Sequence, residues 1–374
     1  IIGIGINVNT QSHKKFYEPA AMALSSNLVY IVYLVFLTSK YGIKGFAVAT
    51  VIGFFVQFAI NVPRYRKLGY RYKFVMDIKD KDARSMFKLM VPIIISTSVV
   101  QLNLFINRSF ANNIYFGAVT VLDYSNKINT LAYEVFAIGI AMIVYPTLSE
   151  LAAKRNILEY KKALVNSINI IMIIMIPAAI AIGVLRHPLV NLIFRRGAFN
   201  LTASNLTSSA LLFYCPAMIA YGVRDILNKA FYSIKDARTP MVNSFIGIIV
   251  NIIINFILVK YMKVSGLTLA TTISTIITTV LMMTSLNKKL NGMNMKKIFS
   301  GFLKISFSSA IMGIFIYIVN YVCMNEISSF MMGSILSIFI SFFAGSIIYF
   351  VCLHFTKIEE YEYILKAVRN KIEV

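Results

Sequence analysis

Ten long apolar stretches lie between Tyr17 and Phe355, and each is long enough to cross a membrane as a helix. A hydrocarbon layer about 30 Å thick is spanned by about 20 residues of α-helix. Hydrophobic residues make up 58% of the 374-residue chain and charged residues only 14%, which is more apolar surface than a water-soluble core can bury. The sequence therefore predicts an integral membrane protein built from helices.

The expected fold class is all-α, a polytopic bundle of transmembrane helices. Continuous apolar runs such as Ile168 to Leu185 exclude the alternating strands of a membrane barrel. We expect helices at residues 17–39, 43–63, 85–112, 119–149, 162–186, 203–233, 239–260, 264–287, 298–322 and 329–355.

The formal net charge of +22 follows the topology of the membrane crossings. If the residues before Tyr17 are cytoplasmic, 27 of the 37 basic residues fall in cytoplasmic segments, eight in outer segments, and Lys127 and Arg224 inside helices. This distribution satisfies the positive-inside rule. The basic excess therefore reflects orientation and attraction to anionic lipid, and we expect no nucleic-acid partner. The three cysteines and three histidines show no metal or redox spacing, so no cofactor or metal is expected.

A short motif occurs twice along the chain. Its glycine and Ala-Thr positions are Gly45, Ala49 and Thr50 in the first copy, and each recurs 221 residues later, with lysines before both glycines. Asn27 has a rough counterpart in Asn251. Both copies run from the cytoplasmic side outward and back, which indicates a parallel duplication about an axis along the membrane normal. Chance similarity between apolar segments is the alternative.

The repeat also predicts a helix count. Four helices, within residues 85–233, precede the second copy, so four are expected before the first, and residues 1–9 resemble the tail of the last of these. We therefore infer fourteen helices in the intact protein and an N-terminally truncated chain. The expected domains are a remnant of the first bundle with a basic cytoplasmic loop (1–84), a second, pseudo-symmetric six-helix bundle (85–290), and a terminal helix pair with a cytoplasmic tail (291–374).

Polar residues inside predicted helices are the candidates for function, because charge in a membrane is costly. Asp123, Lys127, Thr130 and Glu134 share one helical stripe, which Asn126 flanks. A stripe of this kind indicates a water-filled cavity. The competing interpretation for Lys127 is a structural ion pair with Asp123.

Other polar residues within helices leave two interpretations open. Arg108 either extends to the outer surface or binds a ligand. Arg224 and Asp225 point about 100° apart, so they need not pair with each other, and they form either a structural network or a substrate contact. Asn251 and Asn255 lie one turn apart, and by default such asparagines join neighbouring helices.

Three ordered segments resemble the lipid II flippase family (MurJ/MviN) of the multidrug/oligosaccharidyl-lipid/polysaccharide exporter superfamily. The first is Tyr124–Lys127, with Val135–Ala141 and Tyr145–Ser149 downstream. The second is Leu192–Phe199, similar to the family turn L-F-x-R-G-x-F. The third contains Ala230–Ser233 followed by Asp236, Thr239 and Pro240. Weaker similarity covers the whole chain.

This resemblance implies a flippase that moves lipid II, the undecaprenyl-pyrophosphate-linked peptidoglycan precursor, across the bacterial cytoplasmic membrane by alternating access. The family places a basic residue at Lys127, usually Arg; Lys keeps the charge but loses the bidentate fork. The terminal helices, about 298–355, correspond to a pair that forms a groove for the lipid tail. The candidate substrate-binding residues are Lys127, Asn126, Glu134, Arg108, Arg224 and Asp225.

Some family members bind sodium through acidic groups on the seventh and eleventh helices. The matching positions here are Asn107, Asn251, Asn255 and Thr271. Neutral side chains at the acidic positions depart from the sodium-binding pattern.

Three other functions remain as alternatives. A flippase for another lipid-linked oligosaccharide, such as an O-antigen or capsule unit, would have the same fold. A small-molecule antiporter would need buried carboxylates, for which only Glu134 and Asp225 qualify. A peptidoglycan polymerase would need a catalytic carboxylate and usually a large outer domain, and only Asp123 and Glu326 lie near the outer side. We therefore expect a transporter, not an enzyme, with a lipid-linked glycan and membrane lipids as partners and with coupling ion and oligomeric state open.

Overall fold

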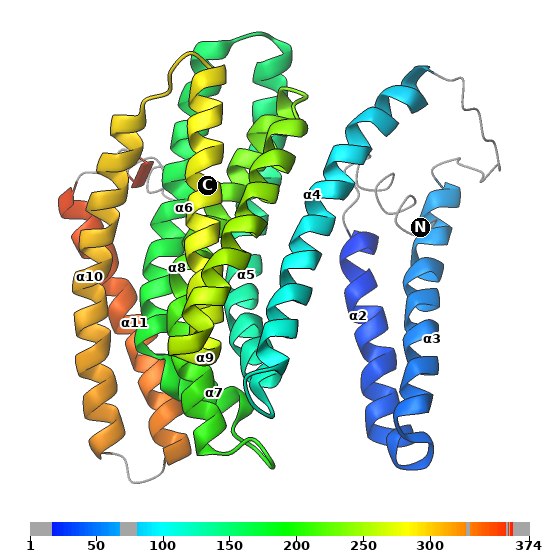
Figure 1. The fold of residues 1–374 in the computed structure, drawn as a ribbon, viewed down its shortest axis with the longest axis vertical. Helices are drawn as coiled ribbons and strands as arrows, with labels where there is room; N and C mark the ends of the chain where they lie inside the picture. The colour runs from blue at the N-terminus through cyan, green and yellow to red at the C-terminus, as the bar shows by residue number, and fades with distance from the viewer. Residues whose placement is uncertain (1–16, 68–80, 327–329, 357, 359, 362–374) are drawn as a thin grey trace. The chain divides into compact units, whose positions relative to one another are not determined.

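The computed structural model describes residues 17–67, 81–326, 330–356, 358 and 360–361. Every regular element in these ranges is a helix, which confirms the all-α prediction (Figure 1). The chain forms two compact units, Ile1–Asp80 and Lys81–Val374. The expected helix tail at residues 1–9 lies outside the described residues. The fourteen-helix count, and the division of the second unit into a bundle and a terminal pair, stay predictions.

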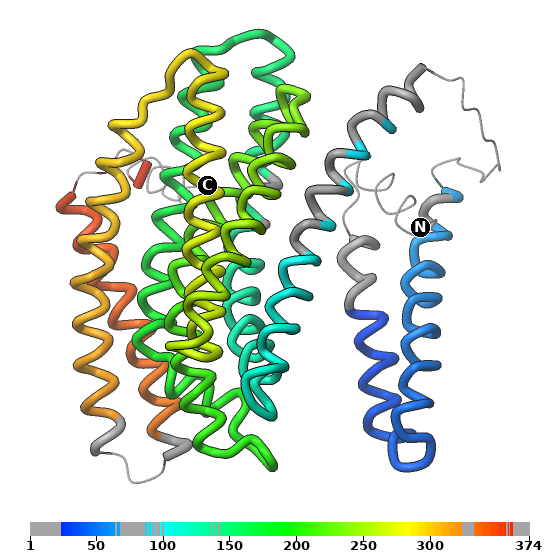
Figure 2. Tube along the Cα trace, in the orientation of Figure 1, coloured from blue at the N-terminus to red at the C-terminus, as the bar shows by residue number. Residues whose placement is uncertain are grey.

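The described residues of the first unit, 17–67, form a helical hairpin that we call the first hairpin. It consists of α2 (Tyr17–Val32), the π-helical turn η1 (Tyr33–Leu37) and α3 (Thr38–Lys67). The chain reverses at Gly42, whose φ of 55° and ψ of −150° suit glycine. The Tyr33 hydroxyl donates to the Gly42 carbonyl at 2.6 Å. The helices predicted at 17–39 and 43–63 are therefore the two legs of this hairpin (Figure 2).

The second unit is a larger helix bundle whose loops alternate between two ends (Figure 1). Its helices are α4 (Lys81–Asn112), α5 (Ala118–Ala153), α6 (Ile157–Val184), α7 (Arg186–Phe194), α8 (Leu201–Ser233), α9 (Arg238–Lys289), α10 (Met295–Glu326) and α11 (Phe330–Thr356).

Helix α9 is a second hairpin, because the chain reverses at Lys263 (φ 53°, ψ −129°). Its legs correspond to the predicted helices 239–260 and 264–287. They approach so closely that a Cβ on Gly247 would overlap the Thr278 hydroxyl.

Helix α7 is absent from the sequence prediction, which placed a single helix at 162–186 followed by a loop. In the structure α6 ends at Val184, and a nine-residue helix begins at Arg186 with Pro188 in its first turn. Its buried residues, Pro188 and Val190, pack it against the bundle, where it contacts α8 and α11. Nine residues are too few to cross a bilayer, so a search for membrane-length runs cannot find this helix.

The core of the second unit centres on α6 and α8, where Tyr160, Ile168 and Leu211 are fully buried. The Tyr160 hydroxyl donates to the Ala230 carbonyl at 2.8 Å and joins the two helices. Helix α10 packs on α6 as well as on α11, so the terminal pair belongs to the same compact unit.

Glu360, one of the described residues after α11, is a buried carboxylate that contacts the bundle. Glu360 is only 4% exposed. It lies 3.0 Å from the Lys297 ammonium and accepts a hydrogen bond of 3.0 Å from Asn169 on α6. A buried charge needs such partners, because desolvating it alone is costly.

Six stretches of described helix are long and apolar enough to cross a membrane. Two of them, Leu24–Pro63 and Arg238–Lys289, contain the hairpin turns, so each provides two crossings. The lengths and compositions fit a multi-pass membrane protein.

Candidate functional site

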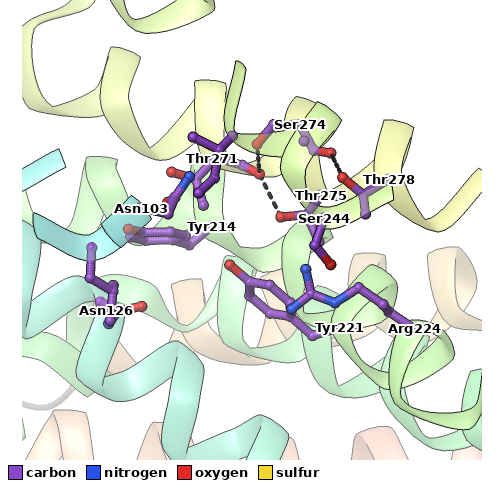
Figure 3. A pocket seen from close by; sticks show the side chains of 13 residues that line it. Asn103, Asn126, Tyr214, Tyr221, Arg224, Ser244, Thr271, Ser274, Thr275 and Thr278 are labelled. Atoms are coloured by element: carbon purple, nitrogen blue, oxygen red, sulfur yellow. Dashed lines mark hydrogen bonds between the residues drawn. The ribbon is translucent and has the colours of Figure 1, made fainter. Parts of the chain in front are cut away.

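A small polar pocket lies inside the second unit where α4, α5, α8 and α9 meet (Figure 3). Its volume of about 60 Å³ exceeds the roughly 10–15 Å³ that one water needs, so it has room for several waters. The polar side chains that line it are Asn103, Asn126, Tyr214, Tyr221, Arg224, Ser244, Thr271, Ser274, Thr275 and Thr278.

Arg224 supplies the positive charge of the polar pocket. Its guanidinium carbon lies 4.9 Å from the centre of the Tyr221 ring, within the range of a cation–π interaction. Figure 3 shows the two side chains next to each other. Asp225 accepts a 2.7 Å hydrogen bond from the Tyr133 hydroxyl on α5. Among the described residues neither Arg224 nor Asp225 has an ion-pair partner. Arg224 lines the pocket, so its charge borders the space inside it.

Asp123 forms an ion pair with Arg108 on α4 and not with Lys127, the partner in the competing interpretation. The Arg108 Nε and the Asp123 Oδ1 are 3.0 Å apart. The turn between α4 and α5 is short, so the end of one helix faces the start of the next. The two side chains are 56% and 37% exposed, and such a pair contributes about 1 kcal/mol or less.

Lys127 and Glu134 are exposed on α5, and neither lines the polar pocket. Within the described parts of the chain Lys127 has no carboxylate partner. Of the six predicted substrate-binding residues, the structure brings Asn126 and Arg224 together in the pocket. Asp225 follows Arg224 in the sequence but does not line the pocket. Arg108 is held by Asp123 instead.

Two of the motif segments meet at one end of the bundle. The Tyr124 ring stacks on Phe194 at 4.3 Å with an interplanar angle of 15°, and lies 5.4 Å from Phe199. The end of α7 and the loop after it therefore pack against α5 about one turn before Lys127.

The four residues of the candidate ion site meet in what we call the amide cluster: Asn107, Asn251, Asn255, Thr271 and the adjacent Ser274. All are 5% exposed or less. Asn255 Nδ2 donates to Asn107 Oδ1 at 2.7 Å and to Asn251 Oδ1 at 3.0 Å. Asn107 Nδ2 donates to Thr271 Oγ1 at 3.0 Å. Hydrogen-bonded amides thus join α4 to both legs of α9, and Thr271 and Ser274 also line the polar pocket.

The segment containing Asp236 is a structural clamp. The Asp236 carboxylate accepts from the Thr239 backbone and hydroxyl, at 3.1 and 2.6 Å, and pairs with Lys289 at the far end of α9. Burial raises the pKa of Asp236, but the hydrogen bonds from Lys289 and Thr239 outweigh it and hold the pKa below its usual value. This carboxylate therefore joins the ends of the two legs of the second hairpin.

Sequence reasoning missed the tyrosines and most of the hydroxyl groups of the polar pocket. Tyr214 and Tyr221 come from α8, and Thr275 and Thr278 from α9. The signal was present: Thr271, Thr275 and Thr278 recur at helical spacing on one face.

The chain matches a known protein family over most of its length. A family model described as lipid II flippase MurJ matches residues 8–342. A "Probable lipid II flippase MurJ" of Rickettsia prowazekii is 28% identical over 208 residues, covering 56% of this chain and 41% of the relative. A "Lipid II flippase MurJ" of Burkholderia cenocepacia is 24% identical over 284 residues, covering 74% and 55%. The chain thus spans about half the length of the curated relatives it matches.

Solved structures give a similar result. The structure titled "Lipid II flippase MurJ, inward closed conformation" matches with a TM-score of 0.71 and 25% identity over 92% of this chain and 68% of that chain. A Vibrio cholerae MATE transporter, VcmN in the bent form, matches with a TM-score of 0.58 and 15% identity over 73% and 62%. The second match concerns the fold alone.

Proposed function

The chain belongs to the lipid II flippase MurJ family of multi-pass bacterial inner-membrane proteins, and we propose that it moves undecaprenyl-pyrophosphate-linked peptidoglycan precursor from the inner to the outer leaflet by alternating access. The observation that carries this proposal is the family match over residues 8–342, most of the chain. The family is one of transporters, and the names of the relatives specify lipid II as their cargo.

The physical problem for such a protein is the pyrophosphate headgroup, because this charged group cannot cross hydrocarbon without polar partners. Lys127 presents an exposed ammonium from α5, and Arg224 presents a guanidinium to the polar pocket. Both are cations inside helices of a chain with few intramembrane charges. They supply the attraction that loads the anionic headgroup into a wet cavity.

The lipid tail has a different requirement, since it must stay in apolar surroundings throughout. Helix α10 exposes large apolar side chains, including Phe299, Phe307 and Ile314. In our proposal the tail lies along α10 and α11 while the headgroup passes through the cavity. Release needs a conformational change that weakens the cationic contacts. Such a change can drive release only if the loading state binds the headgroup more tightly than the releasing state.

The test is Lys127→Ala in the full-length gene, scored by complementation of a strain depleted of its own flippase and by the appearance of lipid II at the outer leaflet. A charged hydrogen bond of roughly 1.5–3 kcal/mol predicts a loss of flipping of about 10- to 100-fold. Lys127→Arg, which keeps the charge, should retain activity. Lys162→Ala, an exposed lysine on α6, serves as the control and should behave as wild type. Wild-type flipping by the Lys127→Ala protein would remove this residue from the mechanism.

The cargo needs its own measurement. Mass spectrometry of lipids that co-purify with the full-length protein should identify a pyrophosphate-linked muropeptide. An O-antigen or capsule repeat unit bound in its place would assign the protein to another lipid-linked glycan without changing the fold.

A further inference from the structure

The amide cluster satisfies its own hydrogen-bond donors without an ion. Its three asparagines carry six amide N–H groups. The Asn107 amide donates to Asn103 and Thr271, at 3.1 and 3.0 Å. The Asn255 amide donates to the other two asparagines. The Asn251 amide donates to the hydroxyls of Thr271 and Ser274, at 3.4 Å each. Every donor thus has an acceptor inside the cluster or at its edge.

The centre of the cluster holds a donor where a cation would need an acceptor. Asn255 Nδ2 lies between the carbonyl oxygens of Asn107 and Asn251, at 2.7 and 3.0 Å. Hard cations are bound by converging oxygen atoms. Here the two oxygens converge on an amide nitrogen, whose hydrogens carry the partial positive charge that a metal ion would otherwise supply.

The charge balance points the same way. None of the five side chains of the cluster is a carboxylate, and all are 5% exposed or less. A monovalent cation placed among them would be a buried charge with no counter-ion in the cluster, which is strongly unfavourable. Of the side-chain oxygens in the cluster, only Asn255 Oδ1 is buried without a hydrogen bond, and one neutral oxygen does not make a cation site. The donor set therefore does not fit the sodium ion that the family resemblance suggests for these positions.

We propose that the junction between α4 and α9 works without a bound monovalent cation in this protein, with the amide of Asn255 occupying the place of the ion. The junction is then a neutral set of amide hydrogen bonds, and a sodium gradient does no work on it. This inference does not depend on which lipid-linked cargo the protein moves.

The experiment uses the purified full-length protein in detergent, with sodium as the only ligand. Thermal unfolding midpoints are compared in NaCl and in choline chloride at equal ionic strength. A ligand that binds only the folded state raises its stability by mass action. Wild-type protein should unfold at the same temperature in both salts and should show no saturable binding of radioactive sodium. A sodium-specific rise in the wild type that Asn255→Leu abolishes would overturn the proposal.

The gain-of-function arm converts the cluster into an ion site. In Asn107→Asp/Asn255→Asp the central donor becomes an acceptor and two negative charges are added, so NaCl should raise the unfolding midpoint by several degrees over choline chloride. Asn243→Asp is the matched control: Asn243 is also buried on α9, at 6% exposure, but lies outside the cluster, and its variant should not respond to sodium.

The remaining outcomes are also decisive. A folded double variant with no sodium response would overturn the role of Asn255 as the group that excludes the ion. If the double variant does not fold, the wild-type binding measurement still decides the proposal. Neither measurement involves flipping, so a failure here is distinct from a failure of the proposed function.

Discussion

The two hairpins share a turn but differ in what fills the space between their legs. Gly42 and Lys263 adopt closely similar φ and ψ angles, and they are separated by 221 residues, as are Gly45 and Gly266. At the same separation, Ser26 and Gln57 in the first hairpin correspond to the contacting pair Gly247 and Thr278 in the second. The cross-leg contacts therefore repeat residue by residue.

The chemistry at these repeated positions is different. Tyr30 lays its ring against Gly53 in the first hairpin, where the second has Asn251 bonded to Ser274. The contact between the Tyr30 ring and Gly53 lies within the first hairpin and needs no partner from another helix. The buried asparagines of α9 instead need partners on another helix, and α4 supplies them. Asn27 is exposed and is not the counterpart of the buried Asn251; in this register Tyr30 is. One scaffold thus holds a tyrosine ring in the first hairpin where the second holds a hydrogen-bonded asparagine.

The largest effect is expected where the legs turn. A Cβ on Gly266 would lie 2.5 Å from the Leu258 carbonyl oxygen, so backbone must move; a Cβ on Gly45 would overlap side-chain atoms of Tyr33 and Tyr41. Gly266→Ala should cost about 3 kcal/mol and Gly45→Ala less. Unfolding midpoints of the full-length variants measure this. Tyr33→Phe should partly rescue Gly45→Ala, and equal costs would mean that the two turns are under the same constraint.

The second effect concerns the amide cluster of the second hairpin alone. Asn255→Leu removes the donor of two buried carbonyl oxygens and should destabilise the protein by about 1–3 kcal/mol. The matched change in the first hairpin is Leu34→Ala, where the side chain is 54% exposed and should have little effect. Chemical denaturation of both variants checks the difference. A neutral Asn255→Leu would show that the amide cluster contributes nothing to stability.

A smaller effect, of opposite sign in the two hairpins, is expected at the turn residues. Lys263 has a positive φ, which costs a non-glycine residue about 1 kcal/mol or more. Lys263→Gly should therefore raise the unfolding midpoint. Gly42→Ala should lower it by conformational strain alone, because no atom lies within 4 Å of the added Cβ. Shifts of the same sign would contradict equivalent turns.

The smallest effect tests the clamp at the open end of the second hairpin. The folded-state pKa of Asp236 is lowered, so its stabilisation is complete above about pH 4 and is lost as the pH falls through the folded pKa. Asp236→Asn should cost about 1 kcal/mol or less at pH 7, and the difference from wild type should shrink as the pH falls through the lowered pKa of Asp236. Unfolding midpoints across this range measure it. The positions that correspond to Asp236 and Lys289 in the first hairpin, Lys15 and Leu68, lie outside the described structure.

Apolar stretches of membrane length located the long helices, because each helix must span the full thickness of the hydrocarbon layer. It could not locate α7, which is held by the buried Val190 rather than by length. It also could not show that Asp123 pairs with Arg108 rather than Lys127, since that depends on how α4 and α5 face each other. Intrahelical spacing favours i to i+4 pairs, whereas the structure used a partner across the turn.

The candidate site was predictable in its parts rather than in its assembly. The resemblance put Asn107, Asn251, Asn255 and Thr271 in one set, and the structure brings them into contact. The polar pocket was not foreseen, because it is made by side chains from four helices, and spacing along one helix says nothing about its neighbours.

The stack of Tyr124 on Phe194 gives this protein a built-in reporter. The chain contains no tryptophan, so Phe194→Trp would place its one indole against the Tyr124 ring on α5. Any motion that parts α5 from the end of α7 must separate these rings and expose the indole to water. Its emission would then shift to the red, and the opening of this end of the bundle could be followed by fluorescence without any label.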